Sequence, residues 1–494
     1  MALIRLDVPA GVYRNGTDLQ SMGRWRDANL IRWIDGTMQP VGGWRKRSDT
    51  ATNAKMRGMI NWADNSNDRW YAAGTYNKLY VYGGATGIQY DITPTGLATG
   101  REDAAAFTGY GGNTYGNYAY NTPRPDTSRI APATAWNFQL WGHYLLANNR
   151  DDGKVYEWQL DNTAIAAQVA NAPVNNRSIV VTEERFLMCL GAGGNVRKLQ
   201  WSDREDNTTW TPAATNEAGD IELSTEGEIM AGVSVRGQTL ILTSRDAHVA
   251  NYVGPPYVYG VERVGAACGL AANLAFANVD EGCFWMGVHS FYKYSGGRVQ
   301  EMACDVSDYV FNDINRAQIS KSFAMTNGKY GEVWWFYPSS DSTENNRYVV
   351  YNYVENTWSI GSLARTAGSD AGTFIYPLMA DPSDNKIYEH EVGFEYSGLT
   401  PFAETGPIMI GTGDNVVSIT EMIPDEKTQG DVSATFKTRF YPNGTERSYG
   451  PFSMSNPTSM RFTGRQLRMR VDGARLADWR VGINRLDAVA GGRR

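Results

Sequence analysis

The chain has 494 residues, of which 42% are hydrophobic and 20% charged, and its formal net charge is −7 at neutral pH. This apolar content can fill a packed core, so disorder is excluded as the dominant state. No apolar run approaches the roughly 20 residues that cross a bilayer, and the negative charge does not suit a general nucleic-acid binder. Residues 1–7 lack a basic stretch followed by an apolar one, so we expect no secretory signal.

Glycine and tyrosine indicate the fold class. The chain contains 52 glycines and 28 tyrosines. Glycine supplies the positive φ angles of tight turns, and aromatic residues favour strands. We therefore predict an all-β protein with many turns.

Seven pairs of short apolar runs follow one another along the chain. Each pair consists of a buried strand, a turn, and a second strand that is rich in aromatic residues. The pairs are residues 69–75 and 78–82, 144–148 and 154–158, 186–190 and 198–203, 239–243 and 248–252, 283–287 and 290–294, 332–337 and 347–352, and 375–380 and 386–389. A spacing of roughly 40 to 55 residues is typical of β-propeller blades. We predict a propeller of about seven blades over residues 51–398.

Aromatic residues in or beside these runs are candidates for packing between blades. Trp136 and Trp141 flank a strand in an aromatic run rather than an exposed loop. The same role is expected for Trp201 and Trp334. All four side chains are predicted to be structural.

Two segments lie outside the repeated pattern. Residues 1–50 are predicted to form an N-terminal segment that closes onto the propeller. A long gap near residues 84–135 contains the Gly/Tyr/Asn stretch Gly109–Tyr118, which cannot bury a core of its own. We interpret it as an inserted loop of a length that is usually functional or mobile.

The pattern changes after about Gly398. Residues 436–440, 467–471 and 479–483 alternate between apolar and polar side chains, which indicates antiparallel sheet packed on one face. We predict a small basic β domain over residues 399–494. Residues 435–494 carry a charge of +8, which leaves −15 for residues 1–434. The alternating arginines Arg468, Arg470 and Arg480 are candidate contacts with an adaptor or a neighbouring subunit, and the alternative is a solvated polar face.

Motifs that would indicate catalysis are absent from the sequence. It contains neither a phosphate-binding Gly-x-x-x-x-Gly-Lys-Ser/Thr loop nor a Gly-x-Ser-x-Gly nucleophile elbow. The histidines His143, His248, His289 and His390 are isolated, and the four cysteines are spread too widely for a zinc site or a disulfide framework. We therefore predict no catalytic, cofactor or metal site and no enzyme activity. The residues indicate a scaffold or a binding protein.

Several segments, taken in order, resemble one known family. It is the tail nozzle family of short-tailed bacteriophages, also called the tail hub or packaged-DNA stabilisation protein. The segments are Gly11–Thr17, Asn29–Trp33, Asp35–Gly36, Gly42–Trp44, Trp136–Ala147, Leu199–Asp203 with Trp210–Pro212, Thr239–Arg245 and, more weakly, Gly450–Phe452. They run from the N-terminus to about residue 250, and the Tyr-rich insertion and the C-terminal domain depart from the family pattern.

The resemblance implies a structural protein of the virion tail, made in the cytoplasm of the bacterial host. Such proteins form a homo-oligomeric ring, expected to be hexameric, of propeller subunits below the portal and adaptor. The ring retains packaged DNA and is its conduit during ejection, and tail fibre or needle proteins are further expected partners. The competing hypothesis is a receptor- or glycan-binding propeller of a virion, because Trp and Tyr stack on sugars. A glycosidase-like propeller enzyme is a third alternative.

Overall fold

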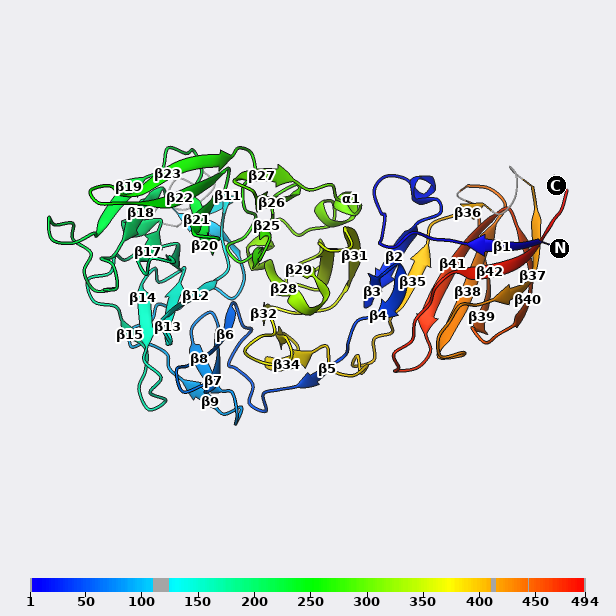
Figure 1. Ribbon diagram of the computed structural model, residues 1–494, viewed down its shortest axis with the longest axis horizontal. Helices are drawn as coiled ribbons and strands as arrows, with labels where there is room; N and C mark the ends of the chain where they lie inside the picture. The colour runs from blue at the N-terminus through cyan, green and yellow to red at the C-terminus, as the bar shows by residue number, and fades with distance from the viewer. Residues whose placement is uncertain (1, 110–123, 410–414, 443, 493–494) are drawn as a thin grey trace.

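The computed structural model describes residues 2–109, 124–409, 415–442 and 444–492. The molecule is elongated, with a β-propeller at one end and a second β domain at the other, where both ends of the described chain lie (Figure 1). Nearly all of its regular structure is strand, so the predicted all-β class, with a propeller and a C-terminal antiparallel domain, is confirmed.

Seven four-stranded antiparallel sheets between residues 44 and 390 form the described blades. From the inner to the outer strand they are β6 (Met59–Ala63), β7 (Arg69–Gly74), β8 (Leu79–Gly83) and β9 (Gln89–Asp91) in blade 1; β12 (Trp136–Trp141), β13 (Tyr144–Asn149), β14 (Val155–Trp158) and β15 (Ala167–Gln168) in blade 2; β16 (Ser178–Val181), β17 (Leu187–Leu190), β18 (Lys198–Trp201) and β19 (Gly219–Glu222) in blade 3; and β20 (Ile229–Val235), β21 (Gln238–Thr243), β22 (Ala247–Gly254) and β23 (Val258–Gly265) in blade 4.

The remaining three blades follow in the same order. They are β24 (Phe276–Val279), β25 (Gly282–Met286), β26 (Phe291–Ser295) and β27 (Arg298–Glu301) in blade 5; β28 (Phe323–Asn327), β29 (Glu332–Tyr337), β30 (Arg347–Asn352) and β31 (Thr357–Ser362) in blade 6; and β32 (Ala367–Ser369), β33 (Leu378–Asp381), β34 (Lys386–His390) and β5 (Trp44–Lys46) in blade 7. The short helical segments are α1 (Ser307–Phe311), η1 (Asp18–Ser21), η2 (Ala192–Gly194), η3 (Ile319–Lys321) and η4 (Gly328–Tyr330).

The two middle strands of each blade correspond to the paired runs in the sequence. They are covered on both faces, because each blade packs against its neighbours, and β29 is buried along its whole length. Strands in that position need apolar side chains on both faces, which produces continuous rather than alternating runs. The inner strands surround a small axial space of about 230 Å³, lined mainly by apolar residues such as Ile60, Phe138, Phe276 and Phe323.

The second domain consists of two packed sheets. One sheet has the strand order β1 (Ala2–Leu6), β42 (Asn484–Ala490), β37 (Val417–Ile423) and β40 (Thr458–Gly464). The other has the order β2 (Trp25–Asn29), β35 (Phe402–Thr405), β41 (Gln466–Gly473), β38 (Val432–Arg439) and β39 (Arg447–Ser453), and β36 (Ile408–Met409) also pairs with β41. The expected alternation is present in β38 and β41. Residues 479–483 form only isolated bridges, in which Val481 pairs with Met38 and Glu426.

The N-terminal segment is shared between the two domains. Within residues 2–50, only β5 joins a blade, where it pairs with β34 and completes blade 7. Strands β1 and β2 pair with β42 and β35 of the second domain, and β3 (Ile31–Ile34) and β4 (Thr37–Pro40) form a hairpin between the domains (Figure 1). The sequence predicts only that residues 1–50 close onto the propeller, because a strand pattern does not identify a partner hundreds of residues away.

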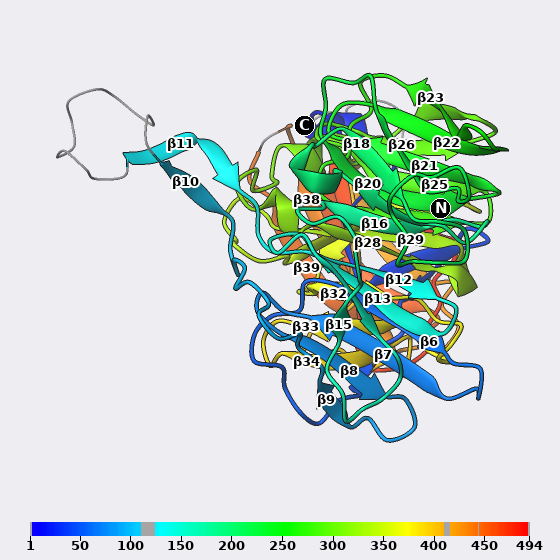
Figure 2. The same ribbon diagram turned by 90° about the vertical axis from the view of Figure 1, so that its left-hand side faces the viewer.

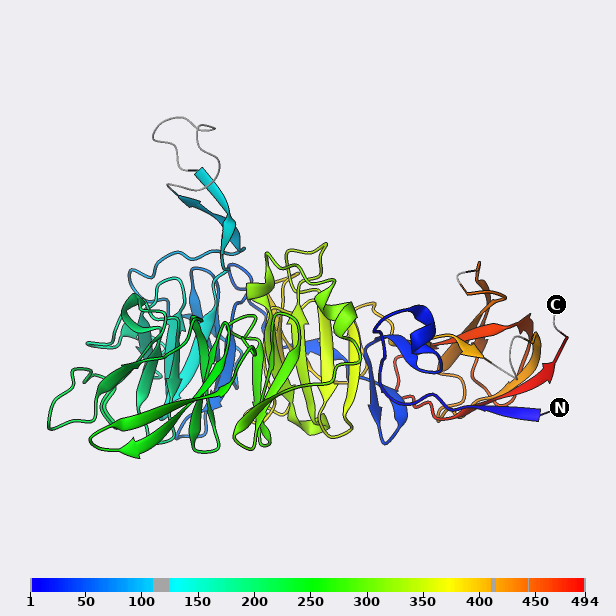
Figure 3. The same cartoon turned by 90° about the horizontal axis from the view of Figure 1, so that it is seen from above.

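The insertion projects from the propeller between blades 1 and 2. Its described part is a hairpin of β10 (Ala105–Gly109) and β11 (Arg124–Ala131), which extends away from the blades (Figures 2 and 3). Gln318 holds its base, because its side chain accepts a hydrogen bond from the Ala104 nitrogen at 3.0 Å and donates one to the Ala104 oxygen at 2.8 Å. The Gly/Tyr-rich stretch that follows Gly109 lies outside the described residues.

Candidate functional site

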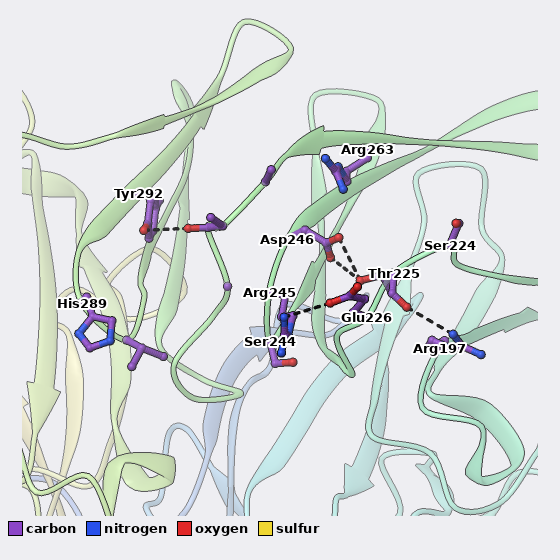
Figure 4. Close-up of a pocket in the computed structure, with 14 residues that line it drawn as sticks. Arg197, Ser224, Thr225, Glu226, Ser244, Arg245, Asp246, Arg263, His289 and Tyr292 are labelled. Atoms are coloured by element: carbon purple, nitrogen blue, oxygen red, sulfur yellow. Dashed lines mark hydrogen bonds and ion pairs between the residues drawn. The ribbon is translucent and has the colours of Figure 1, made fainter.

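A cleft of about 620 Å³ opens on one face of the propeller at blades 3 to 5 (Figure 4). Its walls come from the β19–β20, β21–β22, β23–β24 and β25–β26 connections, together with Arg197 before β18. These connections all leave the same end of their blades, and the β10–β11 hairpin replaces the equivalent connection between β9 and β12. The cleft and the hairpin therefore share one face of the propeller. We call this hollow the blade 3–5 cleft.

Asp246 is the buried carboxylate of the cleft. Its oxygens accept hydrogen bonds from the hydroxyls of Thr225 at 2.8 Å and Thr243 at 2.6 Å, and His248 lies 3.2 Å away. Burial alone would raise the pKa of the Asp246 carboxyl, but these hydroxyls and His248 lower it below its ordinary value. The carboxylate is thus ionised and engaged by its own chain, which makes it a structural group.

Three arginines surround this carboxylate. Arg197 lies 2.5 Å from Glu222, and Arg245 lies 3.1 Å from Glu226, both as exposed pairs. The Arg263 side chain is exposed and makes no hydrogen bond or ion pair with the described residues. The rest of the wall includes apolar groups of Ala266, Ala267, Val288 and Tyr292. The cleft therefore combines guanidinium groups with a small apolar surface.

The arrangement does not resemble a known catalytic constellation. Ser244 Oγ accepts a hydrogen bond from the Glu228 nitrogen at 3.1 Å, and the figure shows His289 on the opposite side of the cleft from Asp246 (Figure 4). Within the described residues, no group of three His, Cys, Asp or Glu side chains is placed to hold a metal ion. In the same part of the chain, no helix is both long enough and apolar enough to span a membrane.

A second constellation lies at the junction of the two domains. Residues 11–44, which we call the clamp, run between the propeller and the second domain. Their backbone is hydrogen-bonded to blade 6. The Val12 nitrogen donates to the Trp358 oxygen at 2.7 Å, and the Leu30 nitrogen donates to the Tyr348 hydroxyl at 2.7 Å. The Asn29 side chain accepts a hydrogen bond from the Ser362 nitrogen at 2.9 Å.

Arg32 is the centre of the clamp. Its guanidinium is buried and forms paired hydrogen bonds with Glu332 at 2.9 and 2.8 Å and with Glu391 at 2.9 and 2.6 Å. The Tyr330 ring covers it at 3.6 Å. Burial raises the pKa of Glu332, and Arg32 opposes that effect. Because the two carboxylates come from blade 6 and from the segment after β34, one side chain joins the hairpin to two parts of the propeller.

Glycines allow the clamp to approach the propeller closely. A Cβ atom on Gly42 would lie 2.5 Å from the Glu391 Cα atom, and one on Gly43 would lie 2.5 Å from the Glu395 nitrogen. Gly11 has a φ of +85°, which L side chains rarely adopt. These glycines belong to the segments in which the sequence resembles the tail nozzle family. The resemblance therefore includes residues that join the two domains.

Two of the four selected tryptophans lie at the first blade seams. Trp136 is fully buried, and its indole nitrogen donates to the Thr75 oxygen of blade 1 at 2.7 Å. Trp141 is only partly buried, and the Arg185 guanidinium lies 5.0 Å from its ring. The sequence predicts the same packing role for both, but Trp141 is at the end of β12, where the blade meets solvent.

The other two tryptophans are buried in later blades. Trp201 lies between blades 3 and 4, with its ring edge-on to Tyr259 at 5.2 Å. Trp334 stacks on Tyr348 at 4.8 Å within blade 6 and packs in one core cluster with Trp44 of blade 7.

The selected arginines face carboxylates of their own chain. Arg468 pairs with Asp18 of the N-terminal segment and with Glu446 at 3.1 Å. Arg470 binds Asp472 at 2.8 Å, and its guanidinium lies 3.7 Å from the Phe402 ring. Arg480 is half-exposed and lies 3.7 Å from Asp478. Arg468 thus joins the N-terminal segment to the second domain, whereas Arg470 pairs with a carboxylate of its own strand.

The two constellations that the fold assembles are not visible in the sequence. Arg32 lies in Asn29–Trp33, one of the segments that resemble the tail nozzle family. Its partners, however, are 300 and 359 positions away along the chain. The blade 3–5 cleft is built from four separate turns. No local pattern marks such residues, although the Asn29–Trp33 match was a signal for the clamp.

Comparisons with known proteins concern the fold alone. No protein-family model matches the sequence, and no curated protein matches it. Solved structures that resemble the chain include the virginiamycin B lyase of Staphylococcus aureus, with 8% identity, a TM-score of 0.43, and coverage of 70% of this chain and 99% of that one. The Cps50 (Swd1) β-propeller domain of Myceliophteria thermophila has 8% identity, a TM-score of 0.41, and coverage of 72% and 99%. The Pan2 WD40 domain of Neurospora crassa has 7% identity, a TM-score of 0.40, and coverage of 70% and 95%.

Proposed function

We propose that this protein is a subunit of the tail ring of a short-tailed bacteriophage, located in the virion below the portal and adaptor. Several copies, expected to be six, surround the channel, retain packaged DNA and form its conduit during ejection. Other tail proteins, such as fibres or a needle, attach to the ring. The observation that carries this proposal is the clamp, in which the segments that resemble the tail nozzle family join two β domains.

A ring that holds DNA under load needs subunits that do not flex. The buried Arg32 group and the close contacts of Gly42 and Gly43 connect the clamp to blade 6 and to the segment after β34. Strands β1 and β2 belong to the second domain, while β5 closes blade 7, so one continuous segment joins both domains. This construction suits a load-bearing wedge in a closed ring.

In this proposal the conduit is not the propeller axis. The space along the propeller axis has a volume of only about 230 Å³ and is lined by side chains of the inner strands. Duplex DNA cannot pass through such a space, so the proposed channel is the opening enclosed by the ring of subunits. Residues 44–398 carry a formal charge of −11. A negative wall would favour sliding of DNA, because lysine and arginine contacts to phosphates hold it in place.

Reconstitution tests the proposal. The purified protein is mixed with the portal–adaptor complex of the same phage, and the products are examined by light scattering and electron microscopy. We expect a ring bound at the tail end of the complex, and we expect virions that lack the protein to lose DNA or infectivity. Recovery of monomers only, together with infectious virions that lack the protein, would contradict the proposal.

The same preparation addresses the glycan-binding hypothesis. Binding of host surface polysaccharide is measured by calorimetry with the purified protein. A monomer that binds polysaccharide and does not join the portal–adaptor complex would favour that function instead.

A further inference from the structure

The β22–β23 hairpin of blade 4 ends in an exposed apolar tip. Its two strands have eight residues each and are the longest in the described blades. At the tip, Tyr257 is 79% exposed and Val253 is 57% exposed, and Pro255 and Pro256 lie between them. No aspartate, glutamate, lysine or arginine occurs between Asp246 and Glu262. We call residues 253–257 the blade 4 tip.

The backbone holds the tip in one shape. Proline fixes its own φ angle, and two consecutive prolines reduce the freedom of the turn. Val258 follows the tip with a φ of +61°, which is a strained conformation for a β-branched residue. Strain of this kind persists where the surrounding structure imposes it, and it is concentrated at functional positions. A rigid tip loses little conformational freedom when it binds.

The blade 3–5 cleft offers a small apolar surface among charged and polar side chains. Ala266, Ala267 and Val288 give it an apolar wall, and Arg263 is available as a donor. Its volume of about 620 Å³ lies in the range of pockets that enclose whole ligands. Tyrosine and arginine are among the residues enriched at the energetic centres of protein interfaces, where an aromatic anchor fills a pocket.

The tip and the cleft lie on opposite faces of the propeller. The tip is the connection between the third and fourth strands of blade 4, whereas the cleft is built from second-to-third and fourth-to-first connections. In Figure 2, β22 and β23 extend away from the side on which the β10–β11 hairpin projects. One subunit therefore cannot place its own tip in its own cleft. A patch and a pocket at different places on one molecule produce a heterologous contact, which generates rings when the rotation closes.

We infer that the blade 4 tip of one subunit docks in the blade 3–5 cleft of the next copy, with the Tyr257 ring on the apolar wall and its hydroxyl near Arg263. This inference rests on the proposed ring and names the contact that closes it. The occupant of the cleft is thus a second copy of this chain.

Single substitutions on each side test the contact by light scattering, with or without the portal–adaptor complex. Tyr257→Ala removes the anchor, and Val288→Arg fills the cleft with a charge. Both positions are exposed, so the melting temperature should remain unchanged while the ring is replaced by single subunits. Ala266→Trp is a second cleft variant if Val288→Arg lowers the melting temperature. Ile375→Ala is the matched control, because Ile375 is also 79% exposed but lies in blade 7.

Mixing the two variants gives the sharpest result. Val288→Arg retains an intact tip and Tyr257→Ala retains an intact cleft, so one productive contact remains between them. We expect the equimolar mixture to form dimers and no ring, whereas each variant alone stays monomeric. A mixture that remains monomeric would overturn the inference.

Other outcomes separate the inference from the proposed function. If wild type and both variants form the same ring, the contact is wrong and the ring remains. If wild type forms no ring even with the portal–adaptor complex, both fail. If Val288→Arg leaves the ring intact but abolishes polysaccharide binding, the cleft holds a saccharide and the inference is overturned.

Discussion

Trp136 illustrates how a single side chain holds two blades together. Its ring is fully buried against blade 1, where a Cβ atom on Gly74 would lie 2.3 Å from the indole. Only glycine at that position leaves room for the ring. The packing and the hydrogen bond to the Thr75 oxygen both depend on an indole at this site.

Replacement of Trp136 and Trp141 should therefore have different costs. Trp136→Ala is expected to lower the free energy of unfolding by about 3–5 kcal/mol, because it removes a fully buried aromatic side chain. Trp141→Ala should cost about 1 kcal/mol, since it loses a partly exposed contact with Arg185. Urea unfolding of both variants measures the difference. Equal costs would contradict the assigned burial.

His390 makes the stability of blade 7 depend on pH. Its Nε2 atom accepts a hydrogen bond from Arg365 Nε at 2.9 Å, and its ring stacks on Trp44 of β5 at 5.3 Å. Burial, followed by the charge of Arg365, lowers the pKa of His390 well below 6.5. The folded protein therefore keeps this imidazole neutral where an unfolded histidine would already bind a proton.

This difference in proton binding has a defined sign. Below pH 6.5 the unfolded chain binds the proton and the native state does not, so the His390 contribution to stability is lost as pH falls. We expect a loss of up to about 1.4 kcal/mol per pH unit that is absent in His390→Gln, which retains a hydrogen-bond acceptor. Denaturant unfolding between pH 5 and 7.5 checks this. Parallel curves for the two proteins would contradict it.

At the scale of elements, closure of the propeller depends on a strand of three residues. Strand β5 completes blade 7 through pairs with β34, and the segment before it passes within contact distance of residues 391–395. A short strand has little stability of its own, so its placement depends on the fit of the neighbouring backbone. Gly42 and Gly43 are the tightest points of that fit.

Gly43→Ala should weaken this closure by steric overlap. The added Cβ would lie 2.5 Å from both the nitrogen and the oxygen of Glu395, so the backbone must move. We expect a loss of about 1–3 kcal/mol, as for overpacked sites, and greater protease sensitivity near residue 44. Gly260→Ala is the control, because its Cβ would make an ordinary 3.4 Å contact with Val253. Similar melting temperatures for the two variants would contradict the fit.

At the scale of the whole molecule, the clamp couples two domains that would otherwise be separate. Most of its buried hydrophobic residues, among them Val12, Trp25 and Trp33, belong to one hydrophobic cluster that extends from blades 4 to 6 into the second domain. The Arg32 group adds charged hydrogen bonds at the same junction. We therefore expect one cooperative unfolding transition in calorimetry.

Arg32→Ala should break that coupling. It leaves Glu332 and Glu391 buried without their cation, and loss of one partner of a buried pair costs about 3–5 kcal/mol. The calorimetric transition is expected to separate into two. Arg45→Ala is the matched control, because Arg45 pairs with Glu389 at 2.7 Å but is 62% exposed, so its loss should leave the transition nearly unshifted. A single unshifted transition in Arg32→Ala would rule out the coupling role.

The repeat was predictable from the sequence for a physical reason. The middle strands of a blade are covered on both faces, so each blade needs two apolar runs separated by a turn, and these runs are visible locally. Residues 332–337 and 347–352, for example, correspond to β29 and β30. The alternation in β38 and β41 likewise indicated a sheet with one covered face. Fold class and the approximate blade number follow from such local patterns.

The pairing of distant segments was decided only by the tertiary structure. Strands β1, β2 and β5 look alike as short sequences, but they enter three different sheets. Arg468 appears free to bind a partner in the sequence, yet the fold brings Asp18 to it. The blade 3–5 cleft and the Arg32 group likewise assemble from separate segments. Local composition determines which residues must be buried, whereas the partner of a strand or a charge depends on chain geometry that only the folded molecule establishes.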